Sequence, residues 1–349
     1  MQAFFPMQSQ NPDIKWPRPH PKTCIVPLFL PFRGCPVRCV FCAQEKQTGQ
    51  REGQSLTAIL DAARGRLLAL AQRRKSGGPS PLLPELAFYG GTFTALPDEE
   101  LQACLDFARA MMAEGLAGTF RCSTRPDCIS AGILERLVQA GCATVELGVQ
   151  SFATEALRLA RRGYDGTIAA DACRAARTAG LRLGVQLLPG MPGVTAGVFL
   201  DDVRRALELG ADFLRFYPCL VLEGTGLAAL WREGAFAPWE LEPTVDILAQ
   251  GWLLAHRANV PVIRMGLAPE PGLADNILAG PVHPALGDMV LGQAALGLVR
   301  EAMRAQGIAR LAQLDVPKRC QGFFWGQKGR LAPCWQELGL HRGNVRFVG

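Results

Sequence analysis

Three cysteines within eight residues carry the clearest chemical signal in this chain. Cys35, Cys39 and Cys42 stand at CxxxCxxC spacing in the run GCPVRCVFC. Three thiolates hold only part of a metal centre, and a [4Fe–4S] cluster bound by three protein thiolates keeps one iron open. S-adenosylmethionine (SAM) can chelate that iron through its amino and carboxylate groups. The spacing therefore predicts an iron–sulfur cluster that supports radical chemistry.

Two other kinds of site use cysteines at short spacing. A structural zinc site needs a fourth protein ligand nearby, and the nearest histidine, His20, lies fifteen residues upstream in a proline-rich arm. A redox dithiol needs only two of the three cysteines. The ligand count therefore favours the cluster over both alternatives.

Composition describes a globular chain with no marked membrane or secretion signal. The 349 residues are 49% apolar, and no run of eighteen apolar residues occurs. The N-terminus lacks a basic start followed by an apolar segment, so we expect a cytoplasmic protein with no membrane association. The net charge of +6 is spread along the chain, so it does not indicate which class of substrate the protein binds. Most other cysteines lie in apolar surroundings typical of buried thiols: Cys104, Cys122, Cys128, Cys142, Cys173 and Cys219.

Short apolar runs alternate with amphipathic segments up to about residue 226. The expected strands are Cys24 to Phe29, Leu86 to Tyr89, Thr119 to Ser123, Ala143 to Val149, Arg182 to Leu188 and Phe213 to Tyr217. The expected helices lie at 55–74, 98–114, 129–140, 153–180 (as two pieces) and 196–209. Six such units predict an α/β fold, a partial (β/α)6 TIM-like barrel. We divide the chain into an N-terminal arm (1–22), this barrel core (23–225) and a C-terminal extension (226–349).

Polar residues gather where the expected strands end, which is where parallel sheets bind ligands. Gly90, Gly91 and Thr92 end the second strand, and the absent glycine side chains allow close approach of main chain to a ligand. A simple turn is the alternative. Ser123, Gln150 and Gln186 lie at the ends of later strands. Asp127 is interpreted as a helix cap.

Glu146 and the arginine pair Arg161 and Arg162 can each be interpreted in more than one way. Glu146 and Gln150 are four residues apart and point to one sheet face. Glu146 either contacts cofactor or substrate, or pairs with an arginine on a neighbouring strand. Arg161 and Arg162 are adjacent in the sequence. An arginine is the expected partner of a cofactor carboxylate, because its planar guanidinium group donates paired hydrogen bonds. We expect Arg161 to lie at the surface.

The C-terminal extension contains two further cysteines and an aromatic, basic stretch. Cys320 and Cys334 flank a long loop without close companions, so free thiols are favoured over an auxiliary cluster. Phe323, Phe324, Trp325, Lys328 and Arg330 have the residue types that stack bases and meet phosphate. The favoured alternative is that this stretch packs the extension onto the barrel.

In order along residues 24–231, the motifs CxxxCxxC, YGGTFTALP, STRPD, GCATVELGVQSF, RRGYDG and AGLRLGVQLLPGMPG resemble the radical SAM superfamily. Within it the chain is similar to the Elongator catalytic subunit and, more distantly, to oxygen-independent coproporphyrinogen oxidase. The resemblance implies one [4Fe–4S] cluster, SAM, and reductive cleavage to a 5′-deoxyadenosyl radical. It also implies a low-potential electron donor of the flavodoxin or ferredoxin type. Phe41 fits the aromatic position beside the last cysteine.

Residue by residue, the resemblance assigns Cys35, Cys39 and Cys42 to the cluster and Gly90, Gly91 and Thr92 to the amino end of SAM. Gln150 and Arg162 look like SAM-contacting positions. Two positions depart from the coproporphyrinogen oxidase branch, which has carboxylates where this chain has Ser123 and Gln186. Both remain candidate cofactor neighbours. Nothing after residue 231 resembles an acetyltransferase domain, so acetyl-dependent tRNA modification does not carry over.

The sequence thus predicts a radical SAM enzyme that abstracts hydrogen from an unidentified substrate. RNA is slightly favoured, and a small metabolite or peptide is the alternative. A different class of function, a non-catalytic iron–sulfur binding or interaction protein on a degenerate barrel, is suggested by Ser123 and Gln186. No residue is assigned to proton or hydrogen transfer. The sequence leaves open whether SAM is consumed or recycled, the oligomeric state, the identity of the electron donor and the roles of Cys320 and Cys334.

Overall fold

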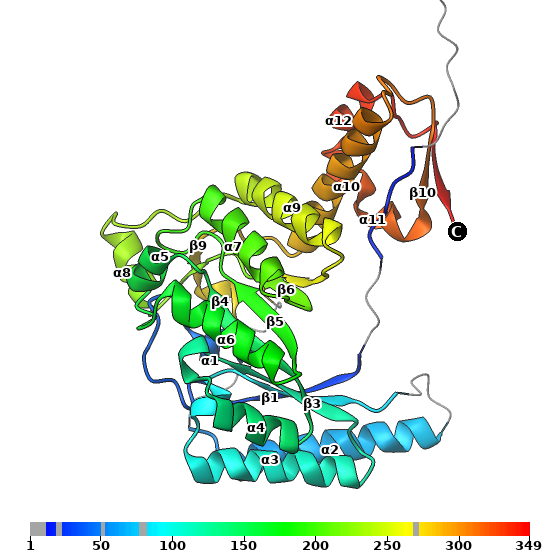
Figure 1. Cartoon of the computed structure of the whole chain (residues 1–349). Helices are drawn as coiled ribbons and strands as arrows, with labels where there is room; N and C mark the ends of the chain where they lie inside the picture. The colour runs from blue at the N-terminus through cyan, green and yellow to red at the C-terminus, as the bar shows by residue number, and fades with distance from the viewer. Residues whose placement is uncertain (1–11, 19–22, 50–52, 77–81, 268–271) are drawn as a thin grey trace, which may run out of the picture.

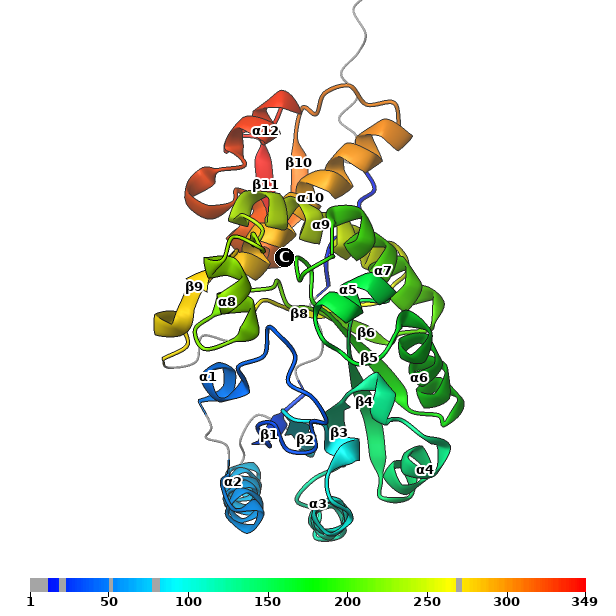
Figure 2. The ribbon, with the colours of Figure 1, turned by 90° about the vertical axis from the view of Figure 1, so that its left-hand side faces the viewer.

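The structure, a computed structural model, describes residues 12–18, 23–49, 53–76, 82–267 and 272–349. Its largest element is a seven-stranded parallel sheet in which strand order follows chain order. The strands are β1 (Ile25–Phe29), β2 (Glu85–Tyr89), β3 (Thr119–Thr124), β4 (Cys142–Gln150), β5 (Arg182–Leu187), β6 (Phe213–Phe216) and β8 (Val262–Met265). Figure 2 shows the sheet curling into a half-barrel whose open side faces α1 (Gln44–Thr48). The expected α/β partial barrel is confirmed.

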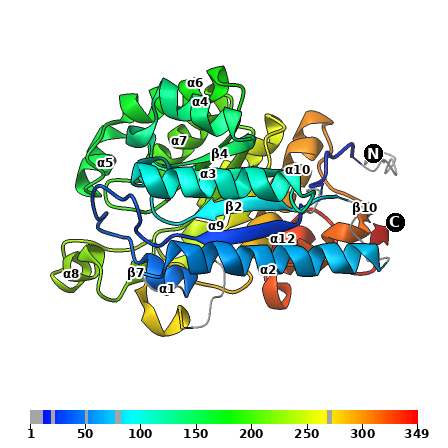
Figure 3. The ribbon, with the colours of Figure 1, turned by 90° about the horizontal axis from the view of Figure 1, so that it is seen from below.

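Helices cover the outer face of the curled sheet. They are α2 (Leu56–Lys75), α3 (Asp98–Ala113), α4 (Ala131–Gln139), α5 (Thr154–Leu159), α6 (Gly166–Thr178) and α7 (Ala196–Glu208). Seen from below, α2 and α3 run alongside β1 and β2 (Figure 3). The amphipathic pattern explains this packing: α7 buries Phe199 and Val203 while Arg204 remains exposed. The segment 153–180 forms two helices, as expected.

The start of α4 differs from the sequence interpretation. Ser130 is its N-cap, and the Ser130 hydroxyl accepts a hydrogen bond from the Ile133 main-chain N–H. Asp127 lies one turn earlier, in a short 3₁₀ segment (Pro126–Cys128), and pairs with Arg125. The cap interpretation of Asp127 was therefore wrong, because a serine closer to the helix serves the same purpose.

The seventh strand, β8, comes from beyond the six expected units. It follows α8 (Gly226–Arg232) and the long helix α9 (Leu241–Arg257), and pairs with β6 in parallel. A separate small sheet pairs β7 (Val221–Leu222) with β9 (Ile277–Ala279) in antiparallel fashion. The strand was missed because only four residues form it and one of them, Arg264, is charged.

A second hydrophobic cluster lies above the barrel in Figure 1, where the C-terminal elements meet α10 (Leu286–Ala305). These elements are β10 (Leu314–Pro317), α11 (Gln321–Phe324), α12 (Ala332–Glu337) and β11 (Val345–Val348). We call this the C-terminal cluster. Phe324 and Trp335 stack at its centre with ring centroids 4.1 Å apart. The described part of the N-terminal arm runs beside it, with Trp16 6.3 Å from Phe324 between ring centroids.

None of the helices in the described ranges is long and apolar enough to cross a membrane.

Candidate active site

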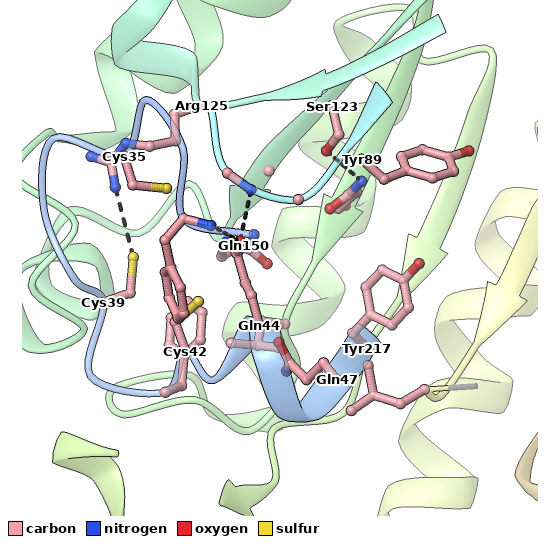
Figure 4. Close-up of a pocket in the computed structure, with 18 of the residues that line it drawn as sticks. Cys35, Cys39, Cys42, Gln44, Gln47, Tyr89, Ser123, Arg125, Gln150 and Tyr217 are labelled. Carbon is pink, nitrogen blue, oxygen red and sulfur yellow. Dashed lines mark hydrogen bonds between the residues drawn. The ribbon is translucent and has the colours of Figure 1, made fainter. Parts of the chain in front are cut away.

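The three predicted cluster cysteines face one cavity. It has a volume of about 380 Å³ and opens at the carboxyl ends of the barrel strands. Cys35, Cys39 and Cys42 lie in the loop between β1 and α1, and each side chain is half-buried. In Figure 4 these cysteines stand on one side of the cavity, and Tyr89 and Tyr217 stand on the other. We call these the cysteine side and the tyrosine side.

The side chain of Gln44 holds the cysteine loop in place by accepting hydrogen bonds from two main-chain N–H groups. The Gln44 Oε1 atom accepts from the main-chain N–H of Phe32 (2.6 Å) and from that of Gly91 (2.7 Å). Gly91 has a φ of 58°, and a Cβ atom there would lie 2.2 Å from the Arg33 carbonyl oxygen. Only glycine fits such a contact. The close approach at Gly91 is therefore made by the cysteine loop, and both Gly90 and Gly91 line the cavity.

Thr92 supports a cysteine and is not among the residues that line the cavity. Its side chain is completely buried, and its Oγ1 lies 3.3 Å from the Cys35 Sγ. The hydroxyl is thus engaged by the thiol. The assigned role of Gly90, Gly91 and Thr92 toward SAM stays a prediction.

Two arginines bring positive charge to Cys39. Arg162 is only 4% exposed, and its Nη1 donates to the Cys39 Sγ at 3.0 Å; Arg125 Nη1 lies 3.7 Å from the same sulfur. Burial lowers the pKa of Arg162, but its contacts with Tyr164 and Cys39 outweigh burial and raise it. Arg161 is exposed, as expected. Both buried guanidinium groups therefore stay charged beside the sulfur.

Arg125 was not singled out from the sequence. Its Nε and Nη2 donate to the two carboxylate oxygens of Asp127 at 2.9 and 2.7 Å. The motif STRPD places the pair just after the end of β3, and an acidic residue two positions after an arginine was the only signal available. The bidentate pair orients Arg125 toward Cys39.

The donor set on the cysteine side suits a cluster held by three thiolates. Burial raises the pKa of Cys35 and that of Cys42, the latter to about 12, so these thiols are neutral until a metal replaces their protons. Arg162 and Arg125 offset the negative charge that three thiolates bring. Within the described ranges, no three His, Cys, Asp or Glu side chains converge on one metal ion. Cluster cysteines need no such convergence, because each binds a different iron.

Gln150 lies between the two sides. It is the last residue of β4, lines the cavity, and has a φ of 68°, in the left-handed region. Such a conformation is uncommon outside glycine, and here it follows a break in the β4 register. The strained position turns the amide into the cavity (Figure 4).

Ser123 and Gln186, the two departures from the coproporphyrinogen oxidase branch, are hydrogen-bonded neighbours in the cavity wall. The Gln186 Nε2 atom donates to the Ser123 Oγ (3.3 Å) and to Glu146 Oε2 (3.2 Å). A neutral amide can lie between a hydroxyl and a carboxylate, where a second carboxylate would repel the first. Glu146 therefore supplies a negative charge just behind the two neutral residues.

Glu146 is completely buried in a network of charges. Its Oε1 accepts from Arg121 Nη1 (3.1 Å) and from the Tyr89 hydroxyl (3.0 Å), and its Oε2 pairs with Arg215 Nε (2.8 Å). Arg121 also pairs with Glu85. Of the two interpretations offered for Glu146, the structure shows the ion pair with strand arginines.

The aromatic, basic stretch of the C-terminal extension packs inside the protein. Phe324 is completely buried between Trp335 and Phe347, and Phe323 is also buried. These rings are unavailable to stack on bases, and they pack within the C-terminal cluster instead of packing directly against the barrel core. Cys320 is buried in the same cluster and Cys334 is half-buried beside it; both are free thiols.

Comparisons with known proteins agree with this geometry. Residues 29–206 match the Radical SAM superfamily, and residues 211–295 match the Radical SAM C-terminal domain. The tRNA uridine(34) acetyltransferase of Methanocaldococcus infernus is 30% identical over 200 residues, covering 52% of this chain and 37% of that protein. Elongator complex protein 3 of Saccharomyces cerevisiae is 26% identical over 250 residues, covering 61% and 44%. The chain thus matches less than half the length of these two relatives.

Among solved structures, the fold is similar to that of an N-terminally truncated Elp3 from Methanocaldococcus infernus. The TM-score is 0.58 at 23% identity, covering 82% of this chain and 63% of that one. This similarity is one of fold: it lies in the arrangement of the helices and strands.

Proposed function

This chain belongs to the radical SAM superfamily, and from that premise we propose that Cys35, Cys39 and Cys42 hold a [4Fe–4S] cluster and that SAM binds beside them. When bound, the cluster and SAM supply reductive cleavage of SAM to a 5′-deoxyadenosyl radical, which abstracts hydrogen from a substrate. The observation that carries the proposal is the convergence of three thiols and two buried guanidinium groups on one side of one cavity.

In this proposal the residues of the chain bind and orient the cluster and SAM. Gln44 and Gly91 hold the cysteine loop against the end of β2. Gly90 and Gln150 border the cavity beside the loop and offer the polar groups that the amino acid end of SAM requires. Arg162 offsets thiolate charge, and Ser123 and Gln186 place neutral polar groups farther along the wall.

Apolar side chains around the cavity exclude water from a reactive radical. Leu188, Leu220 and Leu222 line it, together with Phe29 and Phe41. A water-poor site limits side reactions of reactive intermediates. An external low-potential donor of the flavodoxin or ferredoxin type would supply the electron.

For the substrate we propose RNA. Support comes from the matched relatives, one of which is named a tRNA uridine(34) acetyltransferase, and from the net charge of +6. The internal position of Phe323 and Phe324 removes one argument for it. Binding of total tRNA should weaken steeply with salt if phosphates are contacted; binding that is absent or insensitive to salt would favour a small metabolite.

The deciding experiment is anaerobic cluster reconstitution followed by a dithionite-driven assay for 5′-deoxyadenosine. We expect iron, sulfide and product from the wild type and from Cys334→Ala, which removes a free thiol outside the cavity. Cys39→Ala should lose cluster and product together. Wild-type protein that binds neither iron nor sulfide would overturn the proposal. A loaded cluster that never cleaves SAM, even with tRNA present, would support the non-catalytic alternative.

A further inference from the structure

The cavity wall carries positive charge at both ends. Five arginines line it, and no acidic residue among the described ones does: Arg38, Arg125, Arg162, Arg215 and Arg264. Arg125 and Arg162 lie on the cysteine side, where thiolates offset them. The charge on the tyrosine side has no such use in the chemistry proposed above.

On the tyrosine side, two arginines are neighbours on adjacent strands. Arg215 of β6 and Arg264 of β8 are paired in the parallel register, so both side chains project from the same sheet face into the cavity. Like charges on neighbouring strands repel each other. Their separation from bulk water increases the repulsion, because Arg264 is half-buried and Arg215 is largely buried.

Only one of the two arginines is compensated. Arg215 pairs with Glu146 (2.8 Å) and donates to the hydroxyls of Tyr217 and Tyr89, each at 3.0 Å. For Arg264 the described residues offer one hydrogen bond, from its Nε to the Gly266 carbonyl oxygen at 3.2 Å, and no carboxylate within ion-pair distance. Among the described residues its two terminal nitrogens have no hydrogen-bond or ion-pair partner, so they can bind a group that enters the cavity.

We propose that Arg264 binds an oxyanion group of the substrate, a phosphate or a carboxylate, on the tyrosine side of the cavity. The inference rests on the proposed function, because it assigns the substrate its place opposite the cysteines. A planar guanidinium group donates paired hydrogen bonds to either oxyanion. An oxyanion there also relieves the repulsion between Arg264 and Arg215. If the substrate is RNA, the group is a phosphate.

The test measures equilibrium binding and needs no turnover. Cluster-loaded protein saturated with S-adenosylhomocysteine is titrated anaerobically with uridine 5′-monophosphate, inorganic phosphate or succinate in a calorimeter. We compare wild type, Arg264→Gln, Arg264→Lys and the matched control Arg182→Gln, whose exposed arginine starts β5 at the opposite end of the sheet. Arg264→Lys keeps the charge, and thermal melting of each variant verifies folding.

We expect Arg264→Gln to weaken oxyanion binding by about tenfold or more, the usual range for a charged hydrogen bond. Arg264→Lys should fall between wild type and Arg264→Gln, and Arg182→Gln should match wild type. Succinate binding without phosphate binding would support the subsite and overturn RNA as substrate. Equal affinities of wild type and folded Arg264→Gln for every probe would overturn the subsite itself. Failure of the proposed function appears elsewhere, as missing iron or missing 5′-deoxyadenosine.

Discussion

The two sides of the cavity are built by different means. On the cysteine side, loops meet through main-chain hydrogen bonds, with Gln44 bridging Phe32 and Gly91. On the tyrosine side, strands meet through buried charges centred on Glu146. The first depends on close fit, since Gly91 leaves no space for a methyl group. The second depends on charge balance, since Glu146 has no access to solvent. The two sides should therefore fail in different ways when altered.

The largest effect is expected from Gly91→Ala. The new methyl group would lie 2.2 Å from the Arg33 carbonyl oxygen, and the left-handed backbone alone costs about 1–2 kcal/mol for a non-glycine residue. The cysteine loop must then move, so we expect most of the bound iron to be lost on reconstitution. The matched control is Gly132→Ala in α4, which has open space at the Cβ position. Iron and sulfide analysis gives the answer, and full cluster loading by Gly91→Ala would show that the close fit is dispensable.

Next in size is Glu146→Gln on the tyrosine side. Removing this buried carboxylate leaves Arg215 without its carboxylate partner and leaves Arg121 paired with Glu85 alone, and such a loss typically costs about 3–5 kcal/mol. Chemical denaturation should show this as a lower midpoint with an unchanged slope. Glu155→Gln, in an exposed pair with Arg158, should not change the midpoint measurably. If the two variants were equally stable, the network would contribute little and the contrast between the two sides would disappear.

The smallest effect concerns Asp202 of α7, which joins α7 to the loop that follows Gln150. Its Oδ1 accepts from the Phe152 main-chain N–H at 2.7 Å, while its Oδ2 is buried without a partner among the described residues. Burial raises the pKa of this carboxyl group to about 7. The folded protein therefore holds a proton that the unfolded chain releases, and stability falls as pH rises from about 4 to 7.

We expect this carboxyl group to cost the wild type about 2–3 kcal/mol between pH 5 and pH 8. Asp202→Asn keeps an acceptor for Phe152 and removes the titration. Denaturation of both proteins at the two pH values measures the difference. A wild type and a variant with the same pH dependence would mean that Asp202 is ionised throughout.

The sequence predicted the cysteine side better than the tyrosine side, for a physical reason. Cys35, Cys39 and Cys42 are close in sequence, and short spacing is visible without a structure. The six strand and helix units also follow local periodicity, and all six strands formed. Arg215 and Arg264 are neighbours only because β8 pairs with β6 at the edge of the sheet. No local sequence pattern predicts that strand pairing. Gln44 was missed because a glutamine that bridges two main-chain groups has no sequence signature.

The order of the strands has a consequence for how the chain is made. From β1 to β6, each strand pairs with the one synthesised just before it, so the sheet can grow one unit at a time as the polypeptide leaves the ribosome. Trp16, in contrast, packs against a residue that is synthesised much later, because its partner Phe324 lies near the other end of the sequence. The segment around Trp16 is therefore made long before its partner and can dock only after the C-terminal elements have formed. We therefore expect residues 12–18 to dock last in biosynthesis, after the half-barrel has already formed.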